Sequence, residues 1–412
     1  MSEKMLFLQI MDRFLHGEKT GEALAELSAE ETGRLLNLGR VHSLYPVVFE
    51  AVRLSEGYLA LPEEMRAACK KEARSRVIGQ AMRTSLFLGL YQRILAAGVT
   101  PLVMKGLVLR DLYAQPDSRS SGDEDLLVKR EEFPALDACL VAQGFKRELP
   151  DKPLEAHEIT YWHRNGLHIE VHLSLFPEDS EAYGHLNRAF GGVFDRQVTE
   201  EILGVGIHTL EPTDHMLYLL CHGVKHFLHS GFGIRQVCDM VLFAEHYGSR
   251  IDWKMLEKKA KEEGIWVFAM NLFFLGEKYL GFSWEKAGLR KPDMALDCEA
   301  MLADLLDSGI YGHSSAERTH SANITLQAVS APKNKAGLGR TLFPARDYME
   351  TRYGYVKRHG WLLPVAWGQR IVGYLRRTDR KEAAQTVQTG QRRVALLKQY
   401  GLLREEGQGR DR

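Results

Sequence analysis

The chain has 412 residues, too many for one ordinary core, and its 45% hydrophobic and 26% charged side chains exclude a disordered protein. Its 54 basic and 54 acidic residues balance, so net charge gives no support for nucleic-acid binding, although it leaves that possible. Five scattered cysteines without a Cys-x-x-Cys pair, and an N-terminus unlike a signal peptide, predict a reduced, cytoplasmic protein. No segment reaches the ~20 apolar residues that span a bilayer.

Residues 1–98 are predicted to form an N-terminal helical region. Ser28 and Glu31 make a capping box ahead of a helix that runs to about Arg53. Pro62 begins a long helix with one apolar stripe, which ends at Gly98.

Residues 99–180 change to short apolar segments, which predict a sheet with intervening helices. The Asn165-Gly166 pair between two alternating segments predicts a β-hairpin with a type I′ turn, because that turn needs positive φ twice. The predicted strands cover residues 101–104, 125–128, 145–149, 159–164 and 167–175.

After Pro177 the sequence is predicted to become helical again. We expect a helical subdomain at 181–305, a loop or linker at 306–341, and a C-terminal region at 342–412 that ends in a polar tail.

Three carboxylates predict a metal site. Asp123 and Asp125 stand two residues apart at the start of a strand, so both can project to the same side. Glu170 lies on the polar face of the strand 167–175 and meets them if that strand lies beside 125–128. Such close like charges repel unless a cation lies between them. Hard oxygen ligands suit Mg²⁺, and two such ions serve phosphoryl-type chemistry.

Four residues are candidates for phosphate binding. Lys105 and Gly106 stand where a strand passes into a helix, where glycine permits close approach and the helix start favours an anion. Arg119 can steady a phosphate through its forked donors, and Ser121 can add a hydroxyl. The alternative for Lys105 and Gly106 is an ordinary strand-to-helix turn with a solvated lysine, and the alternative for Arg119 is a surface arginine.

Histidines offer a second chemistry. His168, Glu170 and His172 share a strand face and could chelate zinc in a hydrolase. His222 and His226 have the spacing of a helical zinc pair, but Gly223 stands where a metalloprotease has glutamate. We therefore expect His172, His222 and His226 to line a cleft, with a bond to Asp239 as an alternative for the helical pair.

Several motifs in order resemble the uncharacterised nucleotidyltransferase family of the polymerase-β-like superfamily. These are Met-Lys-Gly at 104–106, Gly-Asp-Glu-Asp-Leu-Leu-Val at 122–128 and His-Ile-Glu-Val-His at 168–172. Later matches extend the resemblance to roughly residues 20–375 and comprise His222, His226, Arg235, Asp239, Phe343-Pro344 and the segment Leu363 to Arg370.

The resemblance implies an α+β protein whose mixed-sheet core is flanked by helical regions. It implies Mg²⁺-dependent transfer of NMP from an NTP such as ATP to an acceptor, with release of pyrophosphate. Asp123 and Asp125 match the metal-binding pair, Glu170 the third carboxylate, and Gly106 the phosphate-binding motif. The chain departs from the family pattern at Leu107, where a serine is usual, and at Glu124, which indicates an exposed strand start or an unidentified partner.

These departures leave a second hypothesis, a nucleotide-binding or protein-binding relative without turnover. A basic cluster beside Trp367 and Tyr374 fits either nucleic acid, anionic lipid or a solvated helix face; it comprises Arg370, Arg376, Arg377, Arg380 and Lys381. The acceptor, the NTP and the oligomeric state stay open.

Overall fold

The computed structural model describes residues 2–18, 24–149, 157–229, 231–309 and 353–369, and also the short pieces 325–326, 328–329, 346, 349–350 and the C-terminal 380–403. The predicted Phe343-Pro344 match, Arg370 and residues 371–379 of the basic cluster lie outside this part of the chain, as does most of the predicted linker. No helix within it is long and apolar enough to cross a membrane.

Helices form the N-terminal region, as predicted. They are α1 (Glu3–Leu15), α2 (Ala29–Val41), α3 (Tyr45–Val52), α4 (Glu56–Leu59) and α5 (Glu63–Ala96). The capping box at Ser28 forms, and Gly98 follows α5 with φ of +79°. The single helix predicted to Arg53 is instead divided, because Ser43 takes a positive φ of 57° between α2 and α3.

A mixed sheet of seven strands forms the core, in the order β3-β4-β5-β2-β1-β7-β6. Its strands are β1 (Leu102–Met104), β2 (Glu124–Leu127), β3 (Lys146–Arg147), β4 (Glu158–Trp162), β5 (His168–His172), β6 (Val198–Ile202) and β7 (Val205–Thr209). β2 pairs antiparallel with β1 and parallel with β5, so the predicted neighbourhood of 125–128 and 167–175 is confirmed.

The predicted hairpin forms between β4 and β5, but with a different turn. The amide of Gly166 donates to the carbonyl of His163, and among the loop residues the positive φ is at Gly166. This is a turn followed by a left-handed glycine rather than the type I′ turn. A two-residue turn with positive φ at both positions joins β6 to β7 instead, at Leu203 and Gly204.

Strands β6 and β7 correct the prediction of helix throughout the chain after Pro177. β7 extends the sheet by pairing parallel with β1, and β6 is its edge. Leu203 in place of Asn or Asp removes the usual hairpin signal, and two consecutive glutamates, Glu200 and Glu201, break the alternation of β6.

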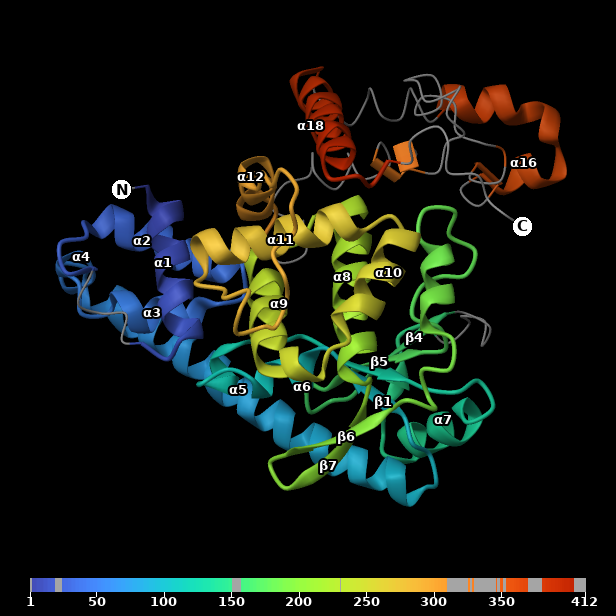
Figure 1. The fold of residues 1–412 in the computed structure, drawn as a ribbon, viewed down its shortest axis with the longest axis horizontal. Coiled ribbons are helices and arrows are strands. Elements are labelled where there is room, and N and C mark those ends of the chain that lie inside the picture. Colours follow the sequence, from blue (N-terminus) through green and yellow to red (C-terminus); the bar gives the residue numbers. More distant parts are fainter. Residues whose placement is uncertain are drawn as a thin grey trace.

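Helices cover both faces of the sheet (Figure 1). One core cluster joins α5 and α7 (Phe133–Ala142) to the sheet residues Val103, Leu126, Ile169 and Val171. Leu102, Met104 and Leu127 of the opposite face join the cluster built by α8 (Pro212–His229) and α9 (Ile234–Tyr247). Side chains of a strand alternate between these two faces, so Asp125, Glu170 and His172 point toward α8 and α9.

The remaining helices extend from these layers. The α-helices are α6 (Gly106–Asp111), α10 (Trp253–Glu262), α11 (Trp266–Tyr279), α12 (Glu299–Ser308), α16 (Gly354–Arg358) and α18 (Arg380–Gln399). Short 3₁₀ helices are η2 (Pro116–Ser118), η3 (Gly184–Phe190), η4 (Gly248–Arg250) and η5 (Gly360–Leu362).

Candidate active site

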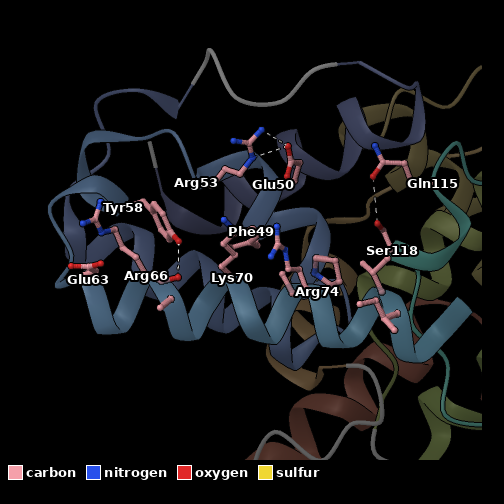
Figure 2. Close-up of a pocket in the computed structure, with 15 residues that line it drawn as sticks. Phe49, Glu50, Arg53, Tyr58, Glu63, Arg66, Lys70, Arg74, Gln115 and Ser118 are labelled. Carbon is pink, nitrogen blue, oxygen red and sulfur yellow. Dashed lines mark hydrogen bonds and ion pairs between the residues drawn. The ribbon is translucent and has the colours of Figure 1, made fainter. Parts of the chain in front are cut away.

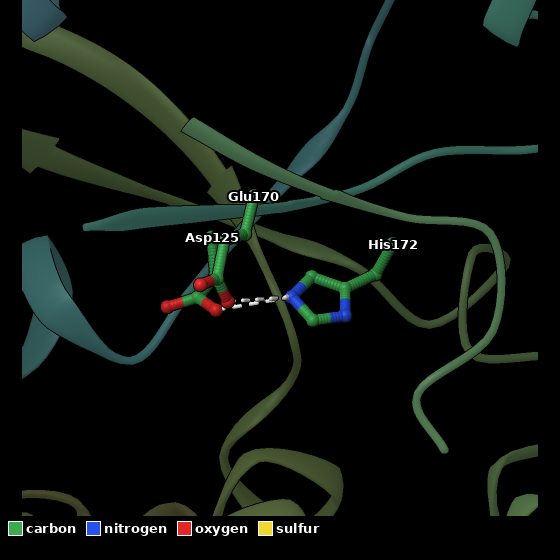
Figure 3. Close-up of side chains that lie close together, drawn as sticks. All are labelled: Asp125, Glu170 and His172. Atoms are coloured by element: carbon green, nitrogen blue, oxygen red, sulfur yellow. Dashed lines mark hydrogen bonds and ion pairs between the residues drawn. The ribbon is translucent and has the colours of Figure 1, made fainter. Parts of the chain in front are cut away.

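Two acids and an imidazole meet where β2 lies beside β5. Asp125 and Glu170 are direct partners in the parallel ladder, so their side chains leave the sheet side by side. His172, two residues further on β5, points its Nε2 at Asp125 Oδ1 from 3.0 Å and lies 3.8 Å from Glu170 Oε2. One ligand atom from each of the three lies within 4.8 Å of the others (Figure 3).

Asp123 lines the same cavity from the residue before β2. Its charge acts on the group, since burial, the carboxylate of Asp125 and that of Asp123 together raise the pKa of Glu170 to about 8. The tight group therefore comprises Asp125, Glu170 and His172, with the third predicted carboxylate beside it. The predicted zinc set with His168 does not assemble, because His168 is exposed and lies outside this group.

Asp125, Glu170 and His172 form the acid group, and the side chain of Lys105 enters it from the turn between β1 and α6. Its Nζ lies 2.8 Å from Asp125 Oδ1 and 3.1 Å from His222 Nε2. Burial alone would raise the pKa of Asp125, but Lys105 and His172 outweigh it and hold that pKa well below its usual range. The lysine backbone has φ of +47°, which is rare outside glycine, and its N–H donates to His215 Nε2 at 3.3 Å.

Gly106 is fixed by protein contacts on one side. A Cβ at this position would lie 2.9 Å from Glu124 Oε2 and 3.3 Å from the carbonyl oxygen of Asp123. The absence of a side chain therefore lets the start of α6 lie against the residues that enter β2. The predicted approach of a phosphate to Gly106 stays a prediction.

Glu124 is buried, which corrects the expectation of an exposed strand start and identifies its partner. Only 3% of Glu124 and 1% of Arg110 are exposed, and Arg110 Nη2 donates to Glu124 Oε1 at 2.7 Å. Arg110 Nη1 also donates to Ser121 Oγ at 2.6 Å, while the Ser121 amide donates to Gln80 Oε1 at 2.9 Å. Ser121 lines the cavity, yet its hydroxyl and its amide already form hydrogen bonds within the protein.

Arg119 lines the cavity as well and is held by Asp239 of α9. Its Nε donates to Asp239 Oδ1 at 3.0 Å, and its Nη2 donates to Oδ2 at 2.6 Å. Tyr113 donates to the same carboxylate at 2.8 Å. The third guanidinium nitrogen, Nη1, is buried and has no hydrogen-bond partner among the described residues. Asp239 thus pairs with Arg119, while Arg235 donates to the carbonyl of Ser120.

Three nitrogen-bearing side chains of α8, which together form the nitrogen wall, face the acid group across a cavity of about 290 Å³. His222, Lys225 and His226 come from one side of α8 and line this cavity. Burial, and then the charge of Lys105, lower the pKa of His226 to about 3 and hold that of His222 well below its usual value. Both rings are therefore neutral near pH 7.

Tyr218, His215 and Glu158 were missed by reasoning from the sequence. Tyr218 stands four residues before His222 on α8, is fully buried, and its hydroxyl has no hydrogen-bond partner among the residues described. Polar residues repeated every four positions along an apolar helix were the available signal. Glu158 lines the cavity from β4 and had no such signal.

A larger groove of about 870 Å³ lies apart from these acids, between α3, α4, α5 and η2 (Figure 2). Arg66, Lys70 and Arg74 line it at four-residue spacing along α5, together with Arg53 and the acids Glu50 and Glu63. Because carboxylates and imidazoles converge in the smaller cavity, that cavity is the candidate active site.

A family model described as "uncharacterised nucleotidyltransferase" matches residues 28–281, more than half of the chain. The chain belongs to this family. The family resemblance seen in the sequence is thereby confirmed, as is the α+β fold with a mixed sheet between helical regions. The matched residues include the whole sheet, the acid group and the nitrogen wall.

A search of the curated proteins gave no match. Among solved structures, the chain is similar to an antigenic nucleotidyltransferase-like protein from Paracoccidioides brasiliensis, with 12% identity and a TM-score of 0.31. The similarity covers 49% of this chain and 93% of that one.

Proposed function

We propose that this family member is a Mg²⁺-dependent nucleotidyltransferase, which moves an NMP from an NTP to an acceptor and releases pyrophosphate. The observation that carries the proposal is the parallel register of β2 and β5, which sets Asp125 beside Glu170 in a cavity that Asp123 also lines. The family to which the chain belongs supports the same chemistry.

The donor set fits a divalent cation. Carboxylate oxygens are the preferred ligands of Mg²⁺. Burial, and then the negative charges of Asp125 and Asp123, raise the pKa of Glu170 even though Lys105 acts in the opposite direction. Asp123, Asp125 and Glu170 would hold one or two ions, whose number a binding stoichiometry measures. His172 would orient Asp125 through its bond to Oδ1. A bound ion would supply charge neutralisation for the phosphates and for the attacking oxygen.

The protein residues supply positioning and a proton acceptor. Lys105 carries a positive charge within reach of Asp125 and is well placed to pair with a phosphate oxygen. Glu170 serves as a ligand or accepts the proton of the acceptor hydroxyl. Gly106, Arg119 and Ser121 stay candidates for orienting the phosphates, with the buried Nη1 of Arg119 as the donor that lacks a partner among the described residues.

The direct test incubates α-labelled NTPs with lysate acceptors and compares wild type with Asp125→Ala. Asp195→Ala is the matched control, since Asp195 is exposed and does not line the cavity. We expect label transfer by wild type and by the control, and none by Asp125→Ala. Transfer that persists in Asp125→Ala would contradict the assignment.

A second candidate is a nucleotide-binding relative without turnover. The contact of Lys105 with Asp125 favours it, because an internal ammonium already neutralises the central acid, and Leu107 offers no hydroxyl to a phosphate. This candidate predicts NTP binding that depends on Mg²⁺ and is lost in Asp123→Asn, with no pyrophosphate released by wild type.

A further inference from the structure

The nitrogen wall of α8 has more hydrogen-bond donors than the described residues supply with acceptors. His222 Nε2 lies 3.1 Å from Lys105 Nζ and 3.2 Å from His226 Nε2. An ammonium can only donate, and one imidazole nitrogen either donates or accepts. If His222 Nε2 accepts from Lys105, it has no proton for His226, so His226 can only compete for the same lone pair.

Lys225 adds a further donor to this wall. It lines the cavity one turn from His222 and makes no hydrogen bond or ion pair within the described part of the chain. Burial, and then the charge of Lys105, lower the pKa of Lys225 from its ordinary value. Two ammonium groups and two imidazoles thus face one space. Asp125 contacts Lys105, while Glu158 and Glu170 act on Lys225 by their charge without an ion pair to it. An anion between these donors would satisfy them.

The donors first considered for phosphate are largely occupied. Two guanidinium nitrogens of Arg119 bind Asp239, and the Ser121 hydroxyl and amide bind Arg110 and Gln80. Against Gly106 lie Glu124 and the carbonyl of Asp123. Apart from Arg119 Nη1, the unsatisfied donors that we consider for phosphate among the described residues that line the cavity therefore lie on its α8 side, opposite the carboxylates that would hold the metal.

We propose that His222, Lys225 and His226 form the binding site for the pyrophosphate portion of the NTP, with Lys105 between this portion and the metal-binding acids. This inference rests on the proposed function and assigns the orientation of the substrate, with the α-phosphate toward Asp125 and Glu170 and the β- and γ-phosphates against α8. A cavity of about 290 Å³ is at the small end for a whole ligand, which fits a triphosphate better than a complete nucleotide.

The same wall would act on the leaving group during transfer. The bond from the acceptor oxygen to the α-phosphorus forms, and the bond from that phosphorus to the bridging oxygen breaks. The electron pair of the broken bond stays on pyrophosphate, and the acceptor hydroxyl gives its proton to Glu170. The N–H donor of His226 and the ammonium of Lys225 lie where they would stabilise the charge that pyrophosphate gains, while His222 Nε2 holds the ammonium of Lys105 beside them.

Calorimetry with inorganic pyrophosphate and MgCl₂ tests this site without any acceptor. His226→Leu and Lys225→Met remove donors from half-buried positions, His226→Gln keeps one, and His246→Leu on the exposed side of α9 is the control. We expect pyrophosphate affinity to fall at least tenfold in His226→Leu and Lys225→Met, and to stay within about threefold of wild type in His226→Gln and His246→Leu. Thermal melting of each variant identifies any that fails to fold.

A comparison of ATP with AMP separates this proposal from the proposed function. Wild type should bind ATP more tightly than AMP, and His226→Leu should lose that difference while it retains AMP and Mn²⁺ binding. Unchanged pyrophosphate affinity in both folded donor-removing variants would overturn the α8 site and leave the nucleotidyltransferase proposal standing. Absence of NTP, pyrophosphate and metal binding in wild type would overturn both.

Discussion

The buried pair of Arg110 and Glu124 permits a quantitative test of how the site is supported. Arg110→Met leaves Glu124 buried at 3% exposure without its cation. Removing one partner of a buried pair costs about 3–5 kcal/mol, a large part of the about 5–15 kcal/mol that stabilises a typical protein. We therefore expect Arg110→Met to lower the free energy of unfolding by about 3–5 kcal/mol.

The double variant Arg110→Met, Glu124→Leu provides the control. It removes both charges and fills the space with apolar groups, so it should recover most of the lost stability. Urea denaturation followed by circular dichroism measures all three proteins. Equal losses in the single and double variants would refute the reasoning, because the cost would then come from packing rather than from an unpaired carboxylate.

The stability of Arg110→Met should also depend on pH, which tests the same pair a second time. Burial, only partly offset by Arg110, already raises the pKa of Glu124 above 4.5, and removal of Arg110 should raise it further. The folded form then keeps the proton after the unfolded form has lost it. The destabilisation should be smallest below pH 4.5 and should grow as pH rises toward the folded-state pKa of Glu124.

Three further predictions concern the cavity and its support. Metal binding at pH 7 should release about 0.9 proton, because Glu170 has a pKa of about 8; calorimetry in two buffers measures this release, and Glu170→Gln should abolish it. Gly106→Ala should cost about 1–3 kcal/mol in thermal unfolding, because its Cβ would lie 2.9 Å from Glu124 Oε2, and an unchanged melting temperature would contradict the contact. Burial lowers the pKa of His215 from 6.5 to about 3, so the unfolded form takes up a proton first as pH falls below 6.5. His215 should thus cost about 2 kcal/mol of stability between pH 7 and pH 5, and urea titrations should show a smaller loss in His215→Gln.

The sequence predicted those parts of the core that depend on local pattern. The alternation of Leu167, Ile169 and Val171 with Glu170 and His172 gave both the strand and its polar face, and the structure confirms both. Residue spacing was enough because strand geometry repeats every two residues. The metal-site hypothesis required the strand at 125–128 to lie beside it, and the parallel pairing of β2 with β5 confirms this neighbourhood.

The sequence did not predict which buried charged residues pair with each other over long distances along the chain. Arg110 with Glu124 and Arg119 with Asp239 pair across separate elements, and no local spacing records such a choice. The hairpin of β6 and β7 was missed because Leu203 supplies a positive φ that its residue type seldom adopts. The position of Lys105 among the acids likewise depends on a backbone conformation that residue type does not reveal.

The residues that line the cavity are spread along the sequence. They include Lys105, which follows β1, residues of β5 and α8, and Asp239 in α9. A ribosome must therefore have released the chain beyond α9 before the acids and the nitrogen wall can face each other. Shorter nascent chains can complete β1 and β2 yet lack half of the cavity. Any activity of this protein should accordingly begin only after translation has passed α9, and no proteolytic fragment that ends before α8 should retain it.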